Sequence, residues 1–134
     1  MAATFEVRTR AQVEFVNITD RVQAAVGEAG VLDGIACVYA PHTTAGVTIN
    51  EGADPDVVRD ITWGLEKMVP STGYEHSEGN SPAHLKATLV GCSTCVPVAG
   101  GRLVLGTWQA VFFCEFDGPR SRRVVVEVVG RGGR

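Results

Sequence analysis

Apolar and polar positions alternate in the first part of the chain. From Phe5 to Phe15 every second residue is apolar or small, and the residues between them are charged or carry an amide. Side chains two positions apart lie on the same face of a β-strand. Residues 4–16 are therefore predicted to form a half-buried antiparallel strand, or a pair of such strands.

Three later segments have the start signals of short helices and apolar residues three or four positions apart. They span residues 20–29, 55–69 and 82–90. The second and third begin at Asp54-Pro55 and Ser81-Pro82, where a capping residue is followed by a proline that fits the first helical turn. Each of these segments is predicted to be a helix.

The rest of the periodic sequence predicts strands separated by glycine-rich turns. These strands are Ile35–Tyr39, Ala45–Ile49, Thr94–Val98, Leu103–Leu105, Gln109–Phe116 and Arg123–Val129. The order of elements predicts an α+β fold, with a mostly antiparallel, sandwich-like sheet and two or three short helices. A length of 134 residues fits one domain over 1–134, with residues 1–3 and 131–134 as loose termini.

Two of the predicted strands, within 111–116 and 124–129, are apolar on both faces. A half-solvated sheet would alternate, so both strands are expected to be covered on both sides. A neighbouring subunit could supply part of that cover. The alternative is that the helices of the same chain supply all of it.

Net charge and apolar content exclude several classes of protein. The formal net charge is −3 and the isoelectric point is near 5.6, whereas general nucleic-acid binders are normally basic. No apolar run is long enough to span a membrane, and the N-terminus lacks the apolar stretch of a signal peptide. We therefore expect a cytoplasmic protein with no nucleic-acid or membrane partner.

The four cysteines favour a structural interpretation. Cys92 and Cys95 form a C-x-x-C motif, but no second pair completes a zinc tetrad. Cys37 and Cys114 lie in apolar runs, where a free cysteine packs as a small hydrophobe. Redox chemistry or metal binding at Cys92 and Cys95 is the less favoured alternative.

The three histidines, His42, His76 and His84, all lie in polar or turn-like surroundings. Three imidazoles are enough protein ligands for an open zinc site. Their spacing along the chain matches no local metal motif, so separate exposed histidines are the alternative. His42 also follows a predicted strand, in the kind of loop where functional residues gather, and we treat it as a candidate catalytic residue.

Acidic residues provide a competing metal hypothesis. Glu51, Asp54 and Asp60 offer the hard oxygen ligands that magnesium prefers, whereas histidines suit zinc. Glu51 is also the candidate general base, and Asp60 is grouped with it as catalytic. The alternative for Glu51 is a solvated residue in a turn.

Four residues are candidates for binding a phosphorylated substrate. The planar guanidinium of Arg120 suits phosphate oxygens, although Arg120 could instead be an exposed turn residue paired with Asp117. Thr107 and Gln109 lie close to Gly106 and could donate hydrogen bonds to a ligand. The missing side chain of Gly106 would let that ligand approach the backbone. Asn80 is the fourth candidate for binding the substrate.

Six motifs stand out together along the chain. They are His42–Glu51, Asp54–Val57 with Asp60, Tyr74–His76, Glu78–Ser81 with Ala83-His84, Gly106–Gln109, and Glu115–Arg120. In this order they resemble the YjbQ family, whose members are often described as secondary thiamine-phosphate synthase enzymes. The resemblance covers residues 5–129, which is nearly the whole chain.

The resemblance implies a compact α+β domain that assembles as a homotrimer. It also implies a weak thiamine-phosphate synthase, which joins a pyrimidine diphosphate to a thiazole phosphate and releases pyrophosphate. A divalent metal, zinc or magnesium, would assist by stabilising the charge on the leaving group. Two alternatives stay open: a hydrolase that uses a histidine-bound metal, and a protein that binds a phosphorylated metabolite without catalysis.

Overall fold

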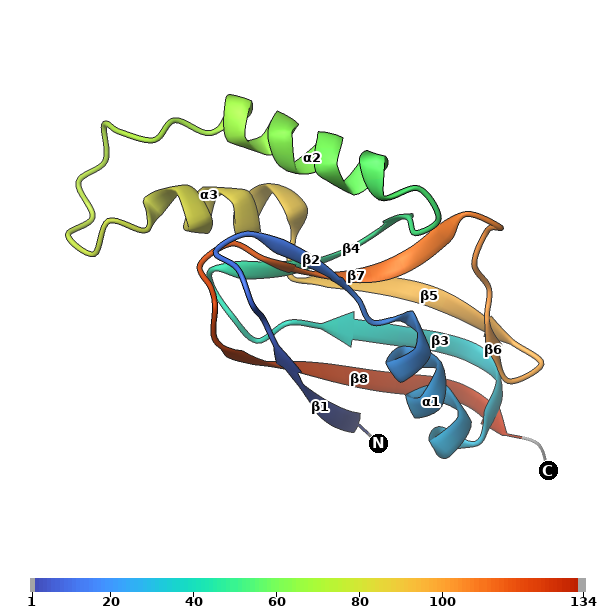
Figure 1. The fold of residues 1–134 in the computed structure, drawn as a ribbon. Coiled ribbons are helices and arrows are strands. Elements are labelled where there is room, and N and C mark those ends of the chain that lie inside the picture. Colours follow the sequence, from blue (N-terminus) through green and yellow to red (C-terminus); the bar gives the residue numbers. More distant parts are fainter. Residues whose placement is uncertain (1, 133–134) are drawn as a thin grey trace.

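The computed structural model describes residues 2–132 and contains eight strands and three helices. In chain order these are β1 (Ala2–Arg8), β2 (Glu14–Asn17), α1 (Thr19–Ala29), β3 (Val31–Tyr39), β4 (Ala45–Glu51), α2 (Pro55–Met68), α3 (Ser81–Val90), β5 (Ser93–Ala99), β6 (Arg102–Leu103), β7 (Gln109–Glu115) and β8 (Ser121–Gly132). Figure 1 shows them as two packed sheets with helices outside. The predicted α+β fold with antiparallel sheets and three helices is confirmed.

The strands form two antiparallel sheets that pack face to face. The larger sheet has the order β1-β8-β3-β5-β6, and the smaller one has the order β2-β7-β4. The main core lies between them, because Val38 and Val126 of the larger sheet belong to the same buried cluster as Val47 and Phe113 of the smaller one. Helix α1 closes this core at one end through its buried Val22 and Val26.

Helices α2 and α3 lie across the outer face of the smaller sheet (Figure 1). Phe112 and Cys114 of β7 point outward and are buried against Ala83 and Ala87 of α3. The inward neighbour Phe113 is buried in the main core. The two-sided apolar pattern of this strand is therefore explained by cover from the same chain.

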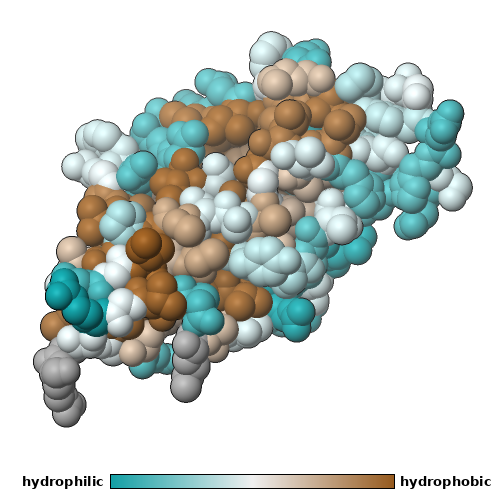
Figure 2. Space-filling view, turned by 180° about the vertical axis from the view of Figure 1, so that it is seen from behind, coloured by the Kyte–Doolittle hydropathy of each residue, from teal (hydrophilic) through white to brown (hydrophobic). Residues whose placement is uncertain are grey.

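The outer face of the larger sheet has no such cover within the chain. Ile35 and Tyr39 of β3 and Val129 of β8 are 49%, 43% and 59% exposed. In the sheet register, Ile35 lies opposite Val129, and Tyr39 lies opposite Val125. These four residues are called the outer-sheet patch below. Figure 2, seen from behind, shows apolar areas separated by polar ones.

Two boundaries differ from the sequence-based expectation. The alternating segment 4–16 splits into β1 and β2, which belong to different sheets, and the chain bends at residues 11–13 between them. Residues 2–3 and 131–132, expected to be loose, lie in strands, with Ala2 opposite Glu127 and Gly132 opposite Val31. Residues 1, 133 and 134 lie outside the described residues. No described helix is long and apolar enough to span a membrane.

Candidate functional site

Four segments that are far apart in the sequence meet at one end of the two sheets. They are the β3–β4 connection with His42, the loop before α3 with His76, the start of α3 with His84, and the β7–β8 turn with Arg120. Together with Arg122 of β8 these residues line an open cavity of about 450 Å³. We call it the histidine–arginine cavity.

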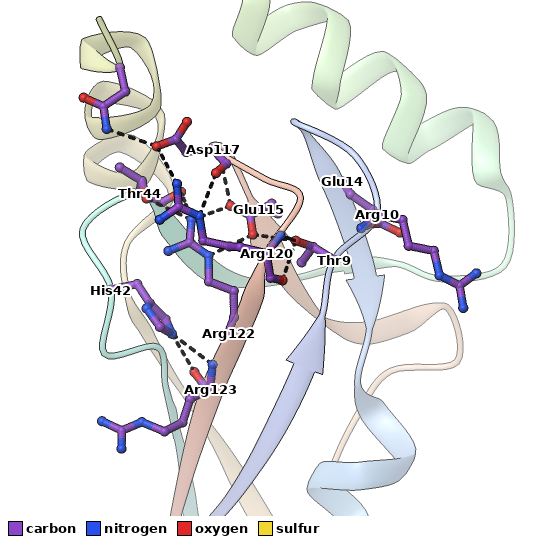
Figure 3. A network of polar contacts seen from close by, with 11 residues as sticks. Thr9, Arg10, Glu14, His42, Thr44, Glu115, Asp117, Arg120, Arg122 and Arg123 are labelled. Atoms are coloured by element: carbon purple, nitrogen blue, oxygen red, sulfur yellow. Dashed lines mark hydrogen bonds and ion pairs between the residues drawn. The ribbon is translucent and has the colours of Figure 1, made fainter. Parts of the chain in front are cut away.

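The ring of His42 is held against the backbone of β8. Its Nε2 lies 3.0 Å from the Arg123 amide nitrogen and 3.1 Å from the Arg123 carbonyl oxygen (Figure 3). Burial lowers the pKa of His42, and the nearby Arg122 cation lowers it further, while the bond to the Arg123 backbone acts in the opposite direction. Because the net shift is downward, His42 is neutral at neutral pH. A neutral ring can accept the Arg123 N–H at Nε2, and it then carries its proton on Nδ1.

His76 and His84, which also line the cavity, have their imidazole rings close together. Their centroids are 5.5 Å apart, and the rings are nearly perpendicular, at 89°. His76 Nε2 also lies 3.6 Å from a carboxylate oxygen of Glu78. The loop and the first turns of α3 thus present two imidazoles next to each other.

A buried ion pair supports the floor of the cavity. Glu115, at the end of β7, is fully buried, and Arg122 of β8 is 5% exposed. Arg122 Nε donates to Glu115 Oε1 at 2.8 Å, and Nη2 donates to Glu115 Oε2 and to the Thr44 hydroxyl. Glu115 also accepts from the Thr9 hydroxyl at 2.8 Å and from the Asp117 N–H at 2.9 Å. The Glu115 carboxylate therefore links the chain after β1 and the β7–β8 turn to strand β8 (Figure 3).

Burial and hydrogen bonding act on Glu115 in opposite directions. Burial alone raises the pKa of a carboxyl group. The bonds from Arg122, the Asp117 amide and Thr9 outweigh that effect, and the net result is a lowered pKa for Glu115. Glu115 is therefore ionised at neutral pH. Glu115 was not among the predicted site residues, although a carboxylate in an otherwise apolar strand was the available signal.

Arg120 and Asn80 share one partner at the mouth of the cavity. Arg120 Nε donates to the Asp117 carbonyl oxygen at 2.9 Å, and Nη2 contacts the Asp117 carboxylate at 3.2 Å. Asn80 Nδ2 donates to the same carboxylate at 3.0 Å. The pairing of Arg120 with Asp117, expected as an alternative, is thus present while Arg120 also lines the cavity. Among the described residues, the buried Oδ1 of Asn80 has no hydrogen-bond partner.

The other candidate residues lie elsewhere. Thr107 and Gln109 line a separate cavity of about 550 Å³ beside α1, and Gln109 accepts a hydrogen bond from the Gly106 amide at 2.7 Å. Glu51 lines a smaller cavity with Asp54, whose amide nitrogen lies 3.3 Å from it. Asp60 is exposed on α2. The structure brings together His42, His76, His84, Asn80 and Arg120, and it does not bring Glu51 or Asp60 to His42.

This geometry contradicts the prediction that His42, His76 and His84 form a metal-binding group. In the part of the chain that the structure describes, no three or more His, Cys, Asp or Glu side chains are arranged so that they could hold a metal ion. His42 directs Nε2 to the backbone of Arg123 rather than toward His76 and His84. The carboxylates expected for magnesium are divided between a turn and an exposed helix face.

Comparison with known proteins identifies the family. The sequence matches the family described as UPF0047 protein YjbQ-like over residues 3–131. The chain belongs to this family. The resemblance drawn from the six motifs is therefore confirmed. The chain is 47% identical over 131 residues to the UPF0047 protein MJ1081 of Methanocaldococcus jannaschii, covering 97% of this chain and 95% of that protein. It is 46% identical over 132 residues to YugU of Bacillus subtilis, covering 97% and 100%.

Solved structures of the UPF0047 family share this fold. A YjbQ/UPF0047 protein from Clostridium acetobutylicum superposes with a TM-score of 0.93 at 52% identity, over 95% of this chain and 99% of that one. A protein from Sulfolobus solfataricus gives a TM-score of 0.93 at 36% identity, over 98% and 97%. The first is described as uncharacterized, and the second as of unknown function.

These relatives correct the prediction of activity. The curated relatives are described only as UPF0047 proteins, and the descriptions of the solved structures name no activity. The prediction of a thiamine-phosphate synthase, and of a transferase in general, was therefore wrong. The alternative of a metal-dependent hydrolase fails as well, because the described residues form no group that could hold its metal.

Proposed function

We propose that the histidine–arginine cavity binds a small molecule through a phosphate group. The observation that carries this proposal is the convergence of two arginines and three histidines, from separate segments, on one open cavity. Guanidinium and imidazole N–H groups are the side-chain donors that suit phosphate oxygens. A cavity of about 450 Å³ also has the size of a small-molecule site.

The existing contacts of the arginines leave donors for a ligand. Arg120 uses Nε and Nη2 to contact Asp117, so these contacts do not involve its Nη1. Arg122 likewise uses Nε and Nη2 to contact Glu115 and Thr44. Since the buried Glu115 holds Arg122 in place, the ligand does not have to order that side chain. Preorganised donors bind more tightly because less conformational entropy is lost on binding.

The acidic residues near the cavity are already paired. Asp117 accepts hydrogen bonds from Arg120 and Asn80, and Glu78 lies beside His76. The Arg120 cation reduces the repulsion that the Asp117 carboxylate would exert on a bound phosphate. His42 contributes as a neutral ring, whose Nδ1 is not used in the contacts with Arg123.

Calorimetric titration with inorganic phosphate, in the presence of a chelator, tests this function. We expect saturable binding that weakens about tenfold or more in Arg120→Ala, since a hydrogen bond to a charged group contributes about 1.5–3 kcal/mol. Arg59→Ala is the matched control, because Arg59 is exposed on α2, away from the cavity, and forms an ion pair with its helical neighbour Asp56. Equal affinity of the Arg120 variant and the wild type, or no binding at all, would overturn the proposal.

We also propose that copies of the chain associate into the homotrimer implied by the family resemblance. The outer-sheet patch supports this, because Ile35, Tyr39 and Val129 are large apolar side chains exposed on neighbouring strands. Exposed large apolar side chains on one sheet face are commonly buried between subunits.

We also propose that the protein is located in the cytoplasm. All four cysteines have free thiols, including Cys37 and Cys95, which lie directly opposite each other on β3 and β5. Reducing compartments maintain thiols in this state. The net charge of −3 agrees with a protein that has no nucleic-acid partner.

A further inference from the structure

A second cavity, of about 400 Å³, adjoins the histidine–arginine cavity. His42, Thr43 and His84 line both cavities, so the two share this part of their walls. We call the second one the adjoining cavity. A ligand held in the first cavity can extend past these residues into the second.

The adjoining cavity has a different chemical character. Beyond the shared residues it is lined by Ala45, Ala87, Thr88, Gly91 and Cys92, none of which is charged. Ala45 and Ala87 are buried, so their methyl groups belong to packed surfaces of β4 and α3. A charged group placed here would lose hydration without gaining an oppositely charged partner, which costs free energy. An apolar group has no such desolvation cost.

The junction between β4 and the end of α3, next to the adjoining cavity, is closely packed. The Val47 amide of β4 donates to the Gly91 carbonyl oxygen at 3.0 Å, and this bond joins β4 to the end of α3. A Cβ on Gly46 would lie 2.5 Å from that same oxygen, so only glycine permits the close approach. This close contact therefore fixes the end of α3, including the cavity-lining Gly91, relative to β4.

We propose that the ligand of this site is an organic phosphate monoester with an uncharged, largely apolar body. This inference rests on the proposed phosphate-binding function and adds to it the chemical class of the ligand. The phosphate lies in the histidine–arginine cavity, and the organic body passes His42 and His84 into the adjoining cavity. Two neighbouring cavities of opposite character thus select one two-part ligand.

Cys92 supplies a direct readout of the adjoining cavity. Its thiol is exposed and lines the adjoining cavity, whereas Cys92 is not among the described residues that line the histidine–arginine cavity, so an organic body bound in the adjoining cavity shields it from alkylation. Iodoacetamide labelling is followed in a Cys95→Ser background, which removes the other exposed thiol. At ten times its dissociation constant, phenyl phosphate should slow the labelling of Cys92 about tenfold, since about one site in eleven stays empty. Inorganic phosphate at the same saturation should leave the labelling rate unchanged.

A variant that fills the adjoining cavity provides the second test. Thr88 is exposed on α3, so Thr88→Phe adds bulk at this cavity without changing the core. We expect phenyl phosphate to bind the wild type more tightly than inorganic phosphate does, and this preference to disappear in Thr88→Phe. Ala24→Phe, on the exposed side of α1, is the matched control and should keep the preference.

The outcomes separate this inference from the proposed function. If inorganic phosphate binds and depends on Arg120, but phenyl phosphate binds no more tightly or leaves Cys92 reactive, the ligand class is wrong and the phosphate site stands. If neither compound binds, the proposed function itself fails, and the inference fails with it.

Discussion

Glu115 and Arg122 form a buried ion pair that joins the two sheets, since β7 belongs to the smaller sheet and β8 to the larger one. Two hydrogen bonds link the side chains, and Thr9, Thr44 and the Asp117 amide satisfy further polar atoms of the pair. Removing one partner from such a pair leaves an uncompensated charge in the interior. The pair therefore couples the stability of the fold to the shape of the cavity beside it.

Glu115→Gln should be strongly destabilising. The variant leaves the Arg122 guanidinium buried without its counter-ion, and the expected loss in the free energy of unfolding is about 3–5 kcal/mol. Urea denaturation followed by circular dichroism measures it. Asp56→Asn is the control, because it breaks an ion pair that is exposed on α2, and it should change stability little.

A double variant keeps this test decisive if Glu115→Gln does not fold. Replacing the pair together, by Glu115→Leu and Arg122→Met, removes both charges, and such exchanges are often neutral or stabilising. The double variant should therefore be more stable than either single variant. Equal or lower stability of the double variant would show that the charge pairing does not determine the effect.

The contribution of Glu115 should depend on pH in a defined direction. Its pKa is lowered in the folded state from an ordinary value of 4.5, so the unfolded chain binds the proton more readily. The stabilisation is therefore complete above pH 4.5 and is lost as the pH falls through the lower folded pKa. The difference in unfolding free energy between the wild type and Glu115→Gln should accordingly be constant near neutral pH and shrink in acid. A difference that does not shrink would contradict the lowered pKa.

The elements of the fold were largely predictable from local patterns, but the site was only partly so. All three helices and the long strands follow from periodicity and capping, as at Asp54, whose carboxylate accepts from the Asp56 amide at 2.9 Å. The gathering of His42, His76 and His84 depends on loops that meet only after the sheets have formed. The Glu115–Arg122 pair was missed because its partners come from different sheets.

The separation of Glu51 from the histidine–arginine cavity has a simple geometric cause. In the register of β4 and β7, Ala45 lies opposite Glu115, and Glu51 lies opposite Gln109. A seven-residue strand separates its two ends by about 20 Å, so residues at the Glu51 end cannot reach the cavity beside Ala45. Motifs that are close in the sequence can thus belong to opposite ends of one strand, and only the register reveals it.

The outer-sheet patch predicts the effect of a charge on assembly. Ile35→Lys places an ammonium group opposite Val129 on the outer-sheet patch, where a subunit contact would have to desolvate it. We expect the wild type to be oligomeric and Ile35→Lys to be monomeric, as measured by size-exclusion chromatography with light scattering. Met68→Lys, at an exposed position on α2, should keep the wild-type assembly. A monomeric wild type would show that the patch is not an interface.

The pKa of the His42 ring should rise when phosphate binds. Without ligand, burial and the Arg122 cation lower its pKa below the ordinary value of 6.5, and an NMR titration of the ring protons should give a midpoint below that value. A bound phosphate places negative charge beside the ring and favours the protonated form, so the midpoint should rise on saturation. The same titration in Arg120→Ala, at the same phosphate concentration, should show a smaller rise because less ligand is bound. If the His42 midpoint is unaffected by phosphate that calorimetry shows to be bound, then the anion lies outside this cavity.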